Sequence, residues 1–186
     1  MLNQLLLFIA QTVVSFFTAL LLFRFYCLLI RLNLKWTAGD LGVFVYQVTD
    51  WLVMPIRRLI PVIRSIDLAC LFAAYLVQCI YLLLKSLLLT AGFYVGIGIA
   101  LTAIFDLSSA CISGLTGLVF ISALLSWFSA NERMKNLFDQ LVNPVLRPFR
   151  AFIPLIASVD LSPLAALLFF QILNIVLQGV RYQLAV

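Results

Sequence analysis

Two stretches of this chain carry the same arginine, aspartate and proline residues at the same spacing. Pro55, Arg57, Pro61 and Asp67 in the first stretch correspond to Pro148, Arg150, Pro154 and Asp160, which lie 93 residues further along. Over the two aligned stretches, 47–68 and 140–161, 9 of 22 positions are identical. The chain is therefore predicted to be a tandem duplication, and the repeated charges are its first candidates for chemistry.

Arginine and aspartate in this pattern favour one of two roles. Asp67 and Asp160 each stand at the start of a long apolar segment, where a carboxylate caps the free backbone amides of a helix and is favoured by the helix dipole. The alternative is a polar centre in which the two carboxylates, together with Arg57 and Arg150, handle an ion or a lipid headgroup. Capping explains the positions without any ligand and is the prediction here; the polar centre stays open.

The composition excludes several kinds of enzyme. The chain has 186 residues and no histidine, which rules out Ser/His/Asp and Cys/His dyads, histidine-rich zinc sites and histidine-ligated haem. Its four cysteines show no CxxC spacing and lie in apolar surroundings, so they are predicted to be small hydrophobic residues. No catalytic, cofactor-binding or metal-binding residue is predicted, and we expect a protein that is not an enzyme and binds no nucleic acid directly.

The elements that position the repeated charges must lie in a membrane. The chain is 65% apolar and 10% charged, with a mean hydropathy of +1.18. Soluble domains are roughly 45–50% apolar and about 25% charged, so this chain cannot cover a soluble fold with polar groups. A membrane crossing takes about 20 residues, range roughly 17–25. Five uncharged stretches qualify by length: 1–23, 68–84, 86–105, 107–131 and 161–180.

The distribution of lysine and arginine decides how many of these stretches cross. Ten of the 12 basic residues lie in two regions, 24–64 and 133–150. Basic loops stay in the cytoplasm, so both regions should face it, which requires an even number of crossings between them. Four spans satisfy this condition and five do not. The predicted fold is an all-α integral membrane protein with four transmembrane helices in two tandem repeats and both termini outside.

The region 68–105 is apolar enough for two spans but is interrupted only by Lys85. We expect one span over about 68–90, with Lys85 extending to the outer headgroups. A Gly-rich re-entrant or interfacial segment would follow it at 92–105. The predicted organisation is a first repeat at 1–90, a Gly-rich apolar connector at 91–106 and a second repeat at 107–186.

Each repeat places an amphipathic basic segment between its two spans. Polar residues recur there at helical spacing, which predicts a helix lying in the cytoplasmic interface, although packing of its apolar face on the spans stays an alternative. Its arginines would meet anionic headgroups, each contributing on the order of 1 kcal/mol. The paired prolines should end or kink the helix before the chain re-enters the bilayer.

One pair of polar residues is predicted inside the membrane. Gln78 and Gln171 match at the repeat offset, each the eleventh residue of its span. An amide at this depth needs a hydrogen-bond partner, and the symmetry predicts bonding between the repeats. A role in conduction is the alternative.

The duplicated Pro-x-Arg pattern, with its second proline and its aspartate, resembles the YggT family, as do Ser126-Trp127 at the end of the third span and the chain length. The resemblance implies a small protein of the bacterial inner membrane, with relatives in cyanobacteria and chloroplasts and no established enzymatic activity. In such a membrane, the charge distribution places both termini in the periplasm. Family members have been linked to osmotic tolerance and ion uptake, to nucleoid or division-site organisation and, in plastids, to assembly of a cytochrome with covalently attached haem. The sequence departs from the pattern at Arg58 and Arg64.

Two function classes follow. The first is a structural or assembly module that presents its paired amphipathic segments to the inner leaflet, with anionic headgroups and unidentified membrane proteins as partners and a homo-oligomer left open. The second is an ion-transport or channel-like protein. Transport needs several polar residues that face one another at membrane depth. Only Gln78, Gln171, Lys85 and a few Ser and Thr are evident, so the first class is predicted.

Overall fold

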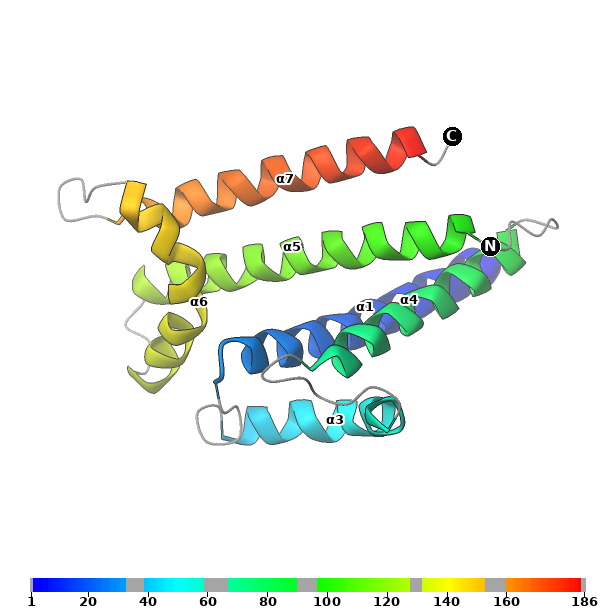
Figure 1. The fold of residues 1–186 in the computed structure, drawn as a ribbon, viewed down its shortest axis with the longest axis horizontal. Helices are drawn as coiled ribbons and strands as arrows, with labels where there is room; N and C mark the ends of the chain where they lie inside the picture. The colour runs from blue at the N-terminus through cyan, green and yellow to red at the C-terminus, as the bar shows by residue number, and fades with distance from the viewer. Residues whose placement is uncertain are drawn as a thin grey trace. The chain divides into compact units, whose positions relative to one another are not determined.

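The computed structural model describes residues 2–32, 39–58, 67–89, 97–127, 132–152 and 160–184. Within these ranges every regular element is an α-helix: α1 (Leu2–Leu29), α3 (Asp40–Arg57), α4 (Leu68–Leu89), α5 (Ile97–Trp127), α6 (Glu132–Phe152) and α7 (Ser162–Leu184) (Figure 1). Four helices, α1, α4, α5 and α7, are long and apolar enough to cross a membrane. The predicted all-α fold with four spans is confirmed.

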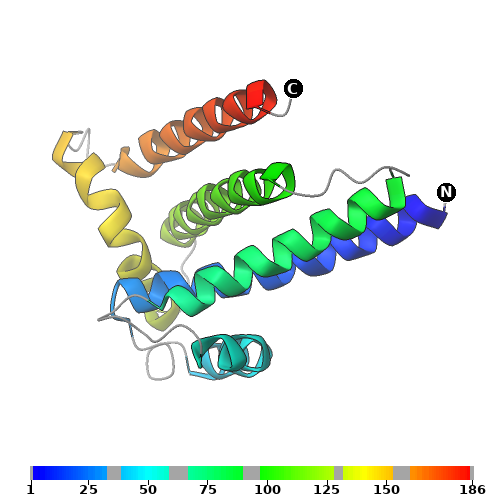
Figure 2. The same cartoon turned by 45° about the vertical axis from the view of Figure 1, so that its right-hand side comes forward.

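The helices fall into two compact units, of which the first holds Met1–Cys111 and Gly179–Val186. In it α1 and α4 pack side by side, with the start of α1 beside the end of α4 (Figures 1 and 2). Small side chains of α4, Ala69, Ala73 and Ala74, share one buried cluster with Leu21 and Leu22 of α1. Small residues let two helix backbones approach closely, which is how spans associate where lipid is as apolar as the helices.

Helix α3 packs against both α1 and α4, at the end where α1 stops and α4 begins (Figure 1). Its inner face buries Val45, Val53 and Ile56, which recur at helical spacing. Its outer face leaves large apolar side chains exposed, among them Trp51 at 64% and Met54 at 62%. This helix therefore exposes large apolar side chains, although the ring of Trp51 meets the ring of Phe17 on α1 at a centroid distance of 6.0 Å.

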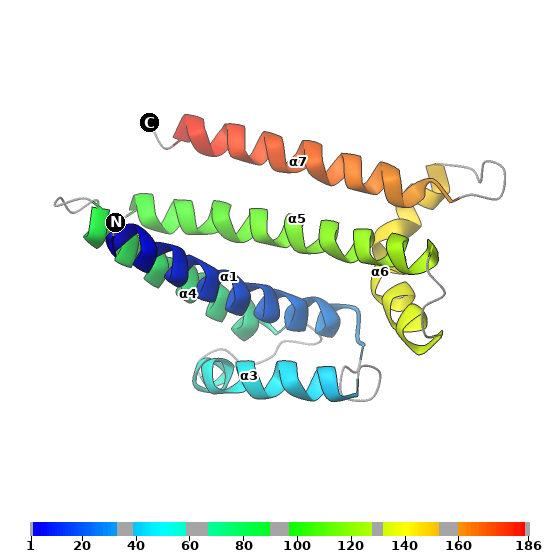
Figure 3. The ribbon, with the colours of Figure 1, turned by 180° about the vertical axis from the view of Figure 1, so that it is seen from behind.

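The second unit, Ile112–Gln178, contains the end of α5, all of α6 and most of α7. Leu137, Leu141 and Leu146 of α6 are buried. The ring of Phe149 meets the rings of Phe169 and Phe170 on α7 edge to face, at centroid distances of 5.6 and 6.3 Å. Seen from behind, α6 follows the end of α5 and lies beside the start of α7 (Figure 3). Aromatic contacts thus join α6 to α7, the following span of its own repeat.

Three of the prolines, Pro55, Pro144 and Pro148, lie inside the amphipathic helices. Pro55 is two residues before the end of α3, and α6 contains Pro148 and also Pro144. Both helices bend along their length (Figure 1), and a proline inside a helix favours a bend because it removes an amide donor and crowds the preceding turn. Pro61 and Pro154 lie outside the described residues.

Two boundaries differ from the sequence prediction. Helix α5 begins at Ile97, and its candidate span covers Gly98–Ser126 without a break, so 97–105 is not a separate re-entrant segment. Gly92 and Gly96 lie outside the described residues. The first span likewise continues past Arg24 to Leu29. The sequence prediction ends a span at each charged residue, here Arg24 in α1 and Asp106 in α5. Each of these charges lies inside its helix because it is paired with an opposite charge on another helix.

Candidate functional site

The repeated arginine and aspartate form an ion pair in the first repeat. Arg57, the last residue of α3, donates from Nε to Oδ2 of Asp67 over 3.1 Å, and its Nη2 bonds the same oxygen. The Asp67 side chain is only 2% exposed, and the Cys70 thiol lies 3.3 Å from Oδ2. Burial disfavours the charge on Arg57, but the hydrogen bond and negative charge of Asp67 outweigh it and raise the pKa of Arg57.

The second repeat makes the same pair at the same offset. Arg150 of α6 donates from Nε to Oδ2 of Asp160 over 3.0 Å, and from Nη1 to the amide oxygen of Asn143 over 2.7 Å. The other oxygen, Asp160 Oδ1, accepts from the backbone amide of Ser162 over 2.9 Å. Burial tends to raise the pKa of Asp160, but the bonds from Ser162 and Arg150 outweigh burial and lower it.

Each pair ties the end of an amphipathic helix to the start of the next span. This contact accounts for the spacing of the motif, because arginine and aspartate are ten positions apart and lie on either side of the connection between the two helices. Asp160 makes the hydrogen bond to a backbone amide that capping predicts. Among the described contacts of Asp67, the carboxylate has Arg57 and Cys70 as partners and no backbone amide, and its Oδ1 is buried without a partner.

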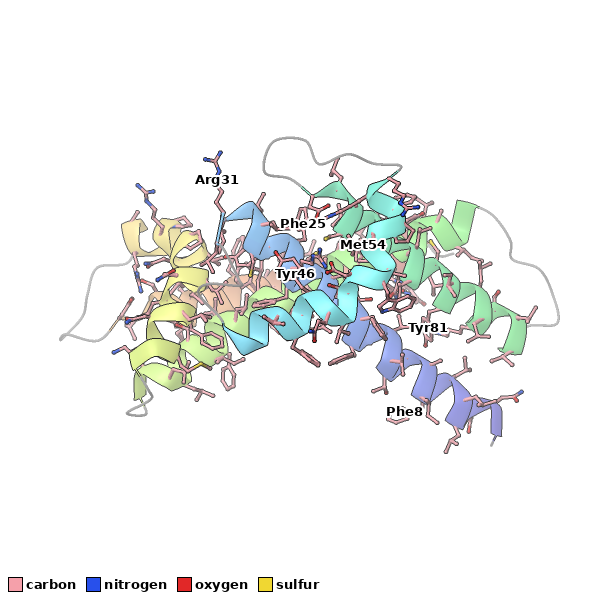
Figure 4. All side chains as sticks on the ribbon, turned by 90° about the horizontal axis from the view of Figure 1, so that it is seen from below. Phe8, Phe25, Arg31, Tyr46, Met54 and Tyr81 are labelled. Carbon is pink, nitrogen blue, oxygen red and sulfur yellow. The ribbon has the colours of Figure 1, made fainter. Side chains whose placement is uncertain are left out.

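A further charged contact, which sequence reasoning missed, lies beside the first pair. Arg24 of α1 is 1% exposed and donates to Thr49 Oγ1 over 2.6 Å. Its Nη1 lies 2.8 Å from Asp50 Oδ1, and its guanidinium stands 4.3 Å from the ring centre of Tyr46. Figure 4 shows α3, which carries Tyr46, crossing α1 at this level. The signal in the sequence was an isolated arginine near the end of an apolar segment.

A second missed contact joins three spans. Arg181 of α7 pairs with Asp106 of α5, whose Oδ2 also accepts from Gln78 Nε2 of α4 over 3.2 Å. Tyr75 supports the same contact, since its hydroxyl donates to the Ala100 carbonyl over 3.4 Å. Asp106 is the only charged residue between Lys85 and Glu132, and Arg181 is the only one after Asp160. These two isolated charges of opposite sign were the feature of the sequence that could have predicted the pair.

The structure shows a hydrogen-bond partner for one of the two predicted intramembrane glutamines. Gln78 has Asp106 as its partner, whereas Gln171 is exposed on α7. Bonding between the two glutamines stays a prediction. Lys85 is exposed near the end of α4, and its extension to the headgroups stays a prediction.

Chemistry that needs a metal has no support in the described part of the chain, where no group of three or more Cys, Asp or Glu side chains could hold an ion. Cys27 and Cys70 are buried and reduced, in line with their predicted role as small hydrophobic residues. The four ion pairs of these ranges each join a helix to another helix or to the start of the next one.

The fold and these contacts define a class of protein: a small multi-pass α-helical protein built as tandem copies of a span, an amphipathic helix and a second span. The chain belongs to the CCB3/YggT family, which matches residues 3–88 and 101–181. Two matched segments are consistent with two repeats, and the family predicted from the duplicated motif is confirmed.

Two of the relatives below cover nearly the whole chain. An uncharacterized protein of Pseudomonas aeruginosa is 30% identical over 178 residues, covering 93% of this chain and 88% of the relative. The uncharacterized protein YggT of Escherichia coli strain K12 is 28% identical over 175 residues, covering 90% and 86%. An uncharacterized protein of Haemophilus influenzae is 27% identical over 137 residues, covering 73% and 72%. No solved structure matches the chain.

Proposed function

We propose that this protein is a non-enzymatic protein of the bacterial inner membrane that holds two amphipathic helices, α3 and α6, at the cytoplasmic leaflet. Its role would be to organise the membrane or to assist the assembly of membrane complexes. The observation that carries the proposal is the repeated ion pair, Arg57 with Asp67 and Arg150 with Asp160, which fixes each amphipathic helix to the following span. A helix needs such a tie only if its position against the spans matters.

The exposed surfaces of the two helices support a place at the membrane surface. Helix α3 leaves Val43, Phe44, Trp51 and Met54 largely exposed, and such apolar side chains are stable at the boundary between headgroups and acyl chains. Helix α6 is more polar outside and carries exposed Lys135, Arg147 and Arg150. Basic side chains are attracted to anionic lipids on the cytoplasmic side. Helix α3 is thus suited to bind the membrane surface through its exposed apolar side chains, and α6 through its basic side chains.

The position of α3 can be measured on the whole protein in vesicles. With Trp36→Phe and Trp127→Phe, Trp51 is the single tryptophan. We expect its fluorescence to be quenched most by lipids brominated near the headgroup end of the acyl chain, and little by acrylamide in water. Stronger quenching by acrylamide would contradict a surface-bound α3.

A specific observation also favours a second candidate, ion transport. Gln78, Asp106 and Arg181 meet within the candidate spans, and ionisable residues at such positions often mark ion pathways. The pairing of both charges argues for a structural contact instead. Potassium and proton flux into vesicles separates the two functions: wild-type protein that carries flux, with Asp106→Asn abolishing it, would favour transport, and absence of flux would favour the organising role.

A further inference from the structure

An open pocket of about 430 Å³ lies on the exposed face of α6, lined by Asn143, Pro144, Arg147 and Arg150. The Arg150 side chain is held in place there, because Asn143 and Asp160 each accept a hydrogen bond from its guanidinium. Two of its nitrogens therefore have known positions, and its Nη2 has no partner in the described contacts. A guanidinium fixed in this way is prepared for a further oxygen ligand.

The pocket carries an excess of positive charge. Arg147 is exposed and makes no ion pair within the described ranges, while Arg150 is balanced by Asp160. Asp139, one turn away on α6, is not among the lining residues. Arg147, Arg150 and Asp160 together carry one unit of net positive charge. A guanidinium group can also donate two parallel hydrogen bonds to two oxygens of one phosphate. The chemistry of the site is that of a phosphate group.

The first repeat lacks this arrangement at the equivalent positions. Asp50 stands in place of Asn143 and Met54 in place of Arg147, while Arg57 matches Arg150. Asp50 is itself paired with Arg24, whose counterpart in the second repeat is Gly117. The charges of this cluster, Arg24, Arg57, Asp50 and Asp67, cancel. The duplication has therefore produced one balanced cluster and one that is open to an anion.

We propose that the α6 pocket binds the phosphate group of an anionic phospholipid, and that the equivalent surface of α3 does not. The inference rests on the proposed place of α6 at the membrane surface, and it assigns a ligand to one repeat only. Arg147 and the free edge of Arg150 contact the phosphate oxygens, and Asn143 orients Arg150. Helix α3 meets the same surface through Phe44, Trp51 and Met54, without a headgroup site.

The test uses the full chain in a neutral detergent and follows thermal unfolding as lipid is added, because a ligand of the folded state raises the unfolding temperature. Phosphatidylglycerol should raise it in a saturable way. Phosphatidylcholine, which carries a phosphate but no net charge, should have little effect at equal concentration. A comparable shift with inorganic phosphate at millimolar concentration would assign the pocket to soluble phosphate and overturn the lipid assignment.

Two variants replace a residue by its counterpart in the other repeat and form a matched pair. Arg147→Met and Arg58→Ala each remove one exposed arginine near the end of an amphipathic helix. Arg147→Met should weaken the affinity for phosphatidylglycerol about fivefold or more, whereas Arg58→Ala should leave it within about twofold. Equal weakening by both variants would mean diffuse attraction to the surface and would overturn the pocket.

A third variant keeps the fold and alters only the charge. Asn143→Asp retains an acceptor for Arg150 but installs the carboxylate of the first repeat, so binding should weaken as in Arg147→Met while the unfolding temperature without lipid stays the same. Wild-type affinity in both Arg147→Met and Asn143→Asp would overturn the proposal. The quenching of Trp51 is measured separately, so failure of the pocket and failure of the surface-bound α3 remain distinguishable.

Discussion

Asp67 and Asp160 occupy equivalent positions in the two repeats, but their carboxylates are held in different ways. Asp160 divides its two oxygens between Arg150 and the Ser162 amide. Asp67 directs one oxygen to Arg57 and leaves the other buried without a partner. The first aspartate therefore depends on its charge partner and the second also on a backbone amide.

This difference predicts different responses to Asn and Ala. Asp160→Asn keeps an acceptor for the Ser162 amide and should be tolerated, whereas Asp160→Ala should cost about 0.5–2 kcal/mol, the usual cost of a lost cap. Asp67→Asn should already lower the unfolding temperature, because it removes the charge that Arg57 neutralises. Thermal unfolding of the four single variants in detergent provides the comparison, and an Asp160→Asn protein as unstable as Asp160→Ala would contradict capping.

The Asp160 carboxyl also predicts a response to acid. Its pKa is lower in the folded protein than the ordinary value of about 3.9, so its ionised form stabilises the fold fully above that value. The contribution is lost as the pH falls through the lowered pKa. Between pH 5 and pH 3 the unfolding temperature should fall more for the wild type than for Asp160→Asn. Parallel curves would show that the carboxyl contributes nothing, and the effect should be small because its side chain is 32% exposed.

At the scale of the helices, α3 and α6 are copies that are anchored differently. Helix α6 is held by apolar and aromatic contacts around Phe149. Helix α3 has, in addition, the buried contact of Arg24 with Thr49 and Asp50. A buried guanidinium contributes to the position of a helix because its partners must lie within hydrogen-bond distance for its charge to be stable.

The Arg24 contact predicts a local effect of substitution. Arg24→Met should loosen α3 and speed its amide hydrogen exchange about tenfold or more, the effect expected from losing hydrogen bonds to a charged group. Exchange in α6 should not change, which makes α6 an internal control. Arg58→Ala removes an exposed arginine at the end of α3 and should leave exchange unaltered. Unchanged α3 exchange in Arg24→Met would show that the contact does not hold the helix.

The sequence was sufficient for the features that depend on neighbouring residues. Apolar length predicts the spans, helical spacing predicts α3 and α6, and the repeat predicts that Arg57 and Arg150 share a role. The contacts of Arg24 with Asp50 and of Asp106 with Arg181 could not be predicted in this way. Each contact joins residues that are distant in sequence. The residues next to a charge do not show whether folding will bring an opposite charge to it, so they do not show that the charge can lie inside a span.

At the scale of the whole molecule, four spans and the positive-inside rule predict one orientation. Both basic regions should face the cytoplasm and both termini the periplasm. Reporter fusions after Arg64 and after Arg150 should therefore report the same, cytoplasmic side, and a fusion after Thr90 the opposite side. A fusion after Arg64 and one after Arg150 that reported opposite sides would require an odd number of crossings between them.

The pair of Asp106 with Arg181 has a consequence for how the chain is made. The two residues are 75 positions apart, so at about 5–20 residues per second the ribosome needs about 4–15 s to add Arg181 after Asp106. During that interval the third span carries an uncompensated carboxylate, with the Gln78 amide as its partner from the earlier part of the chain. The charge of Asp106 therefore waits for α7 to arrive, and a chain halted before its last helix keeps an unpaired charge in its third span.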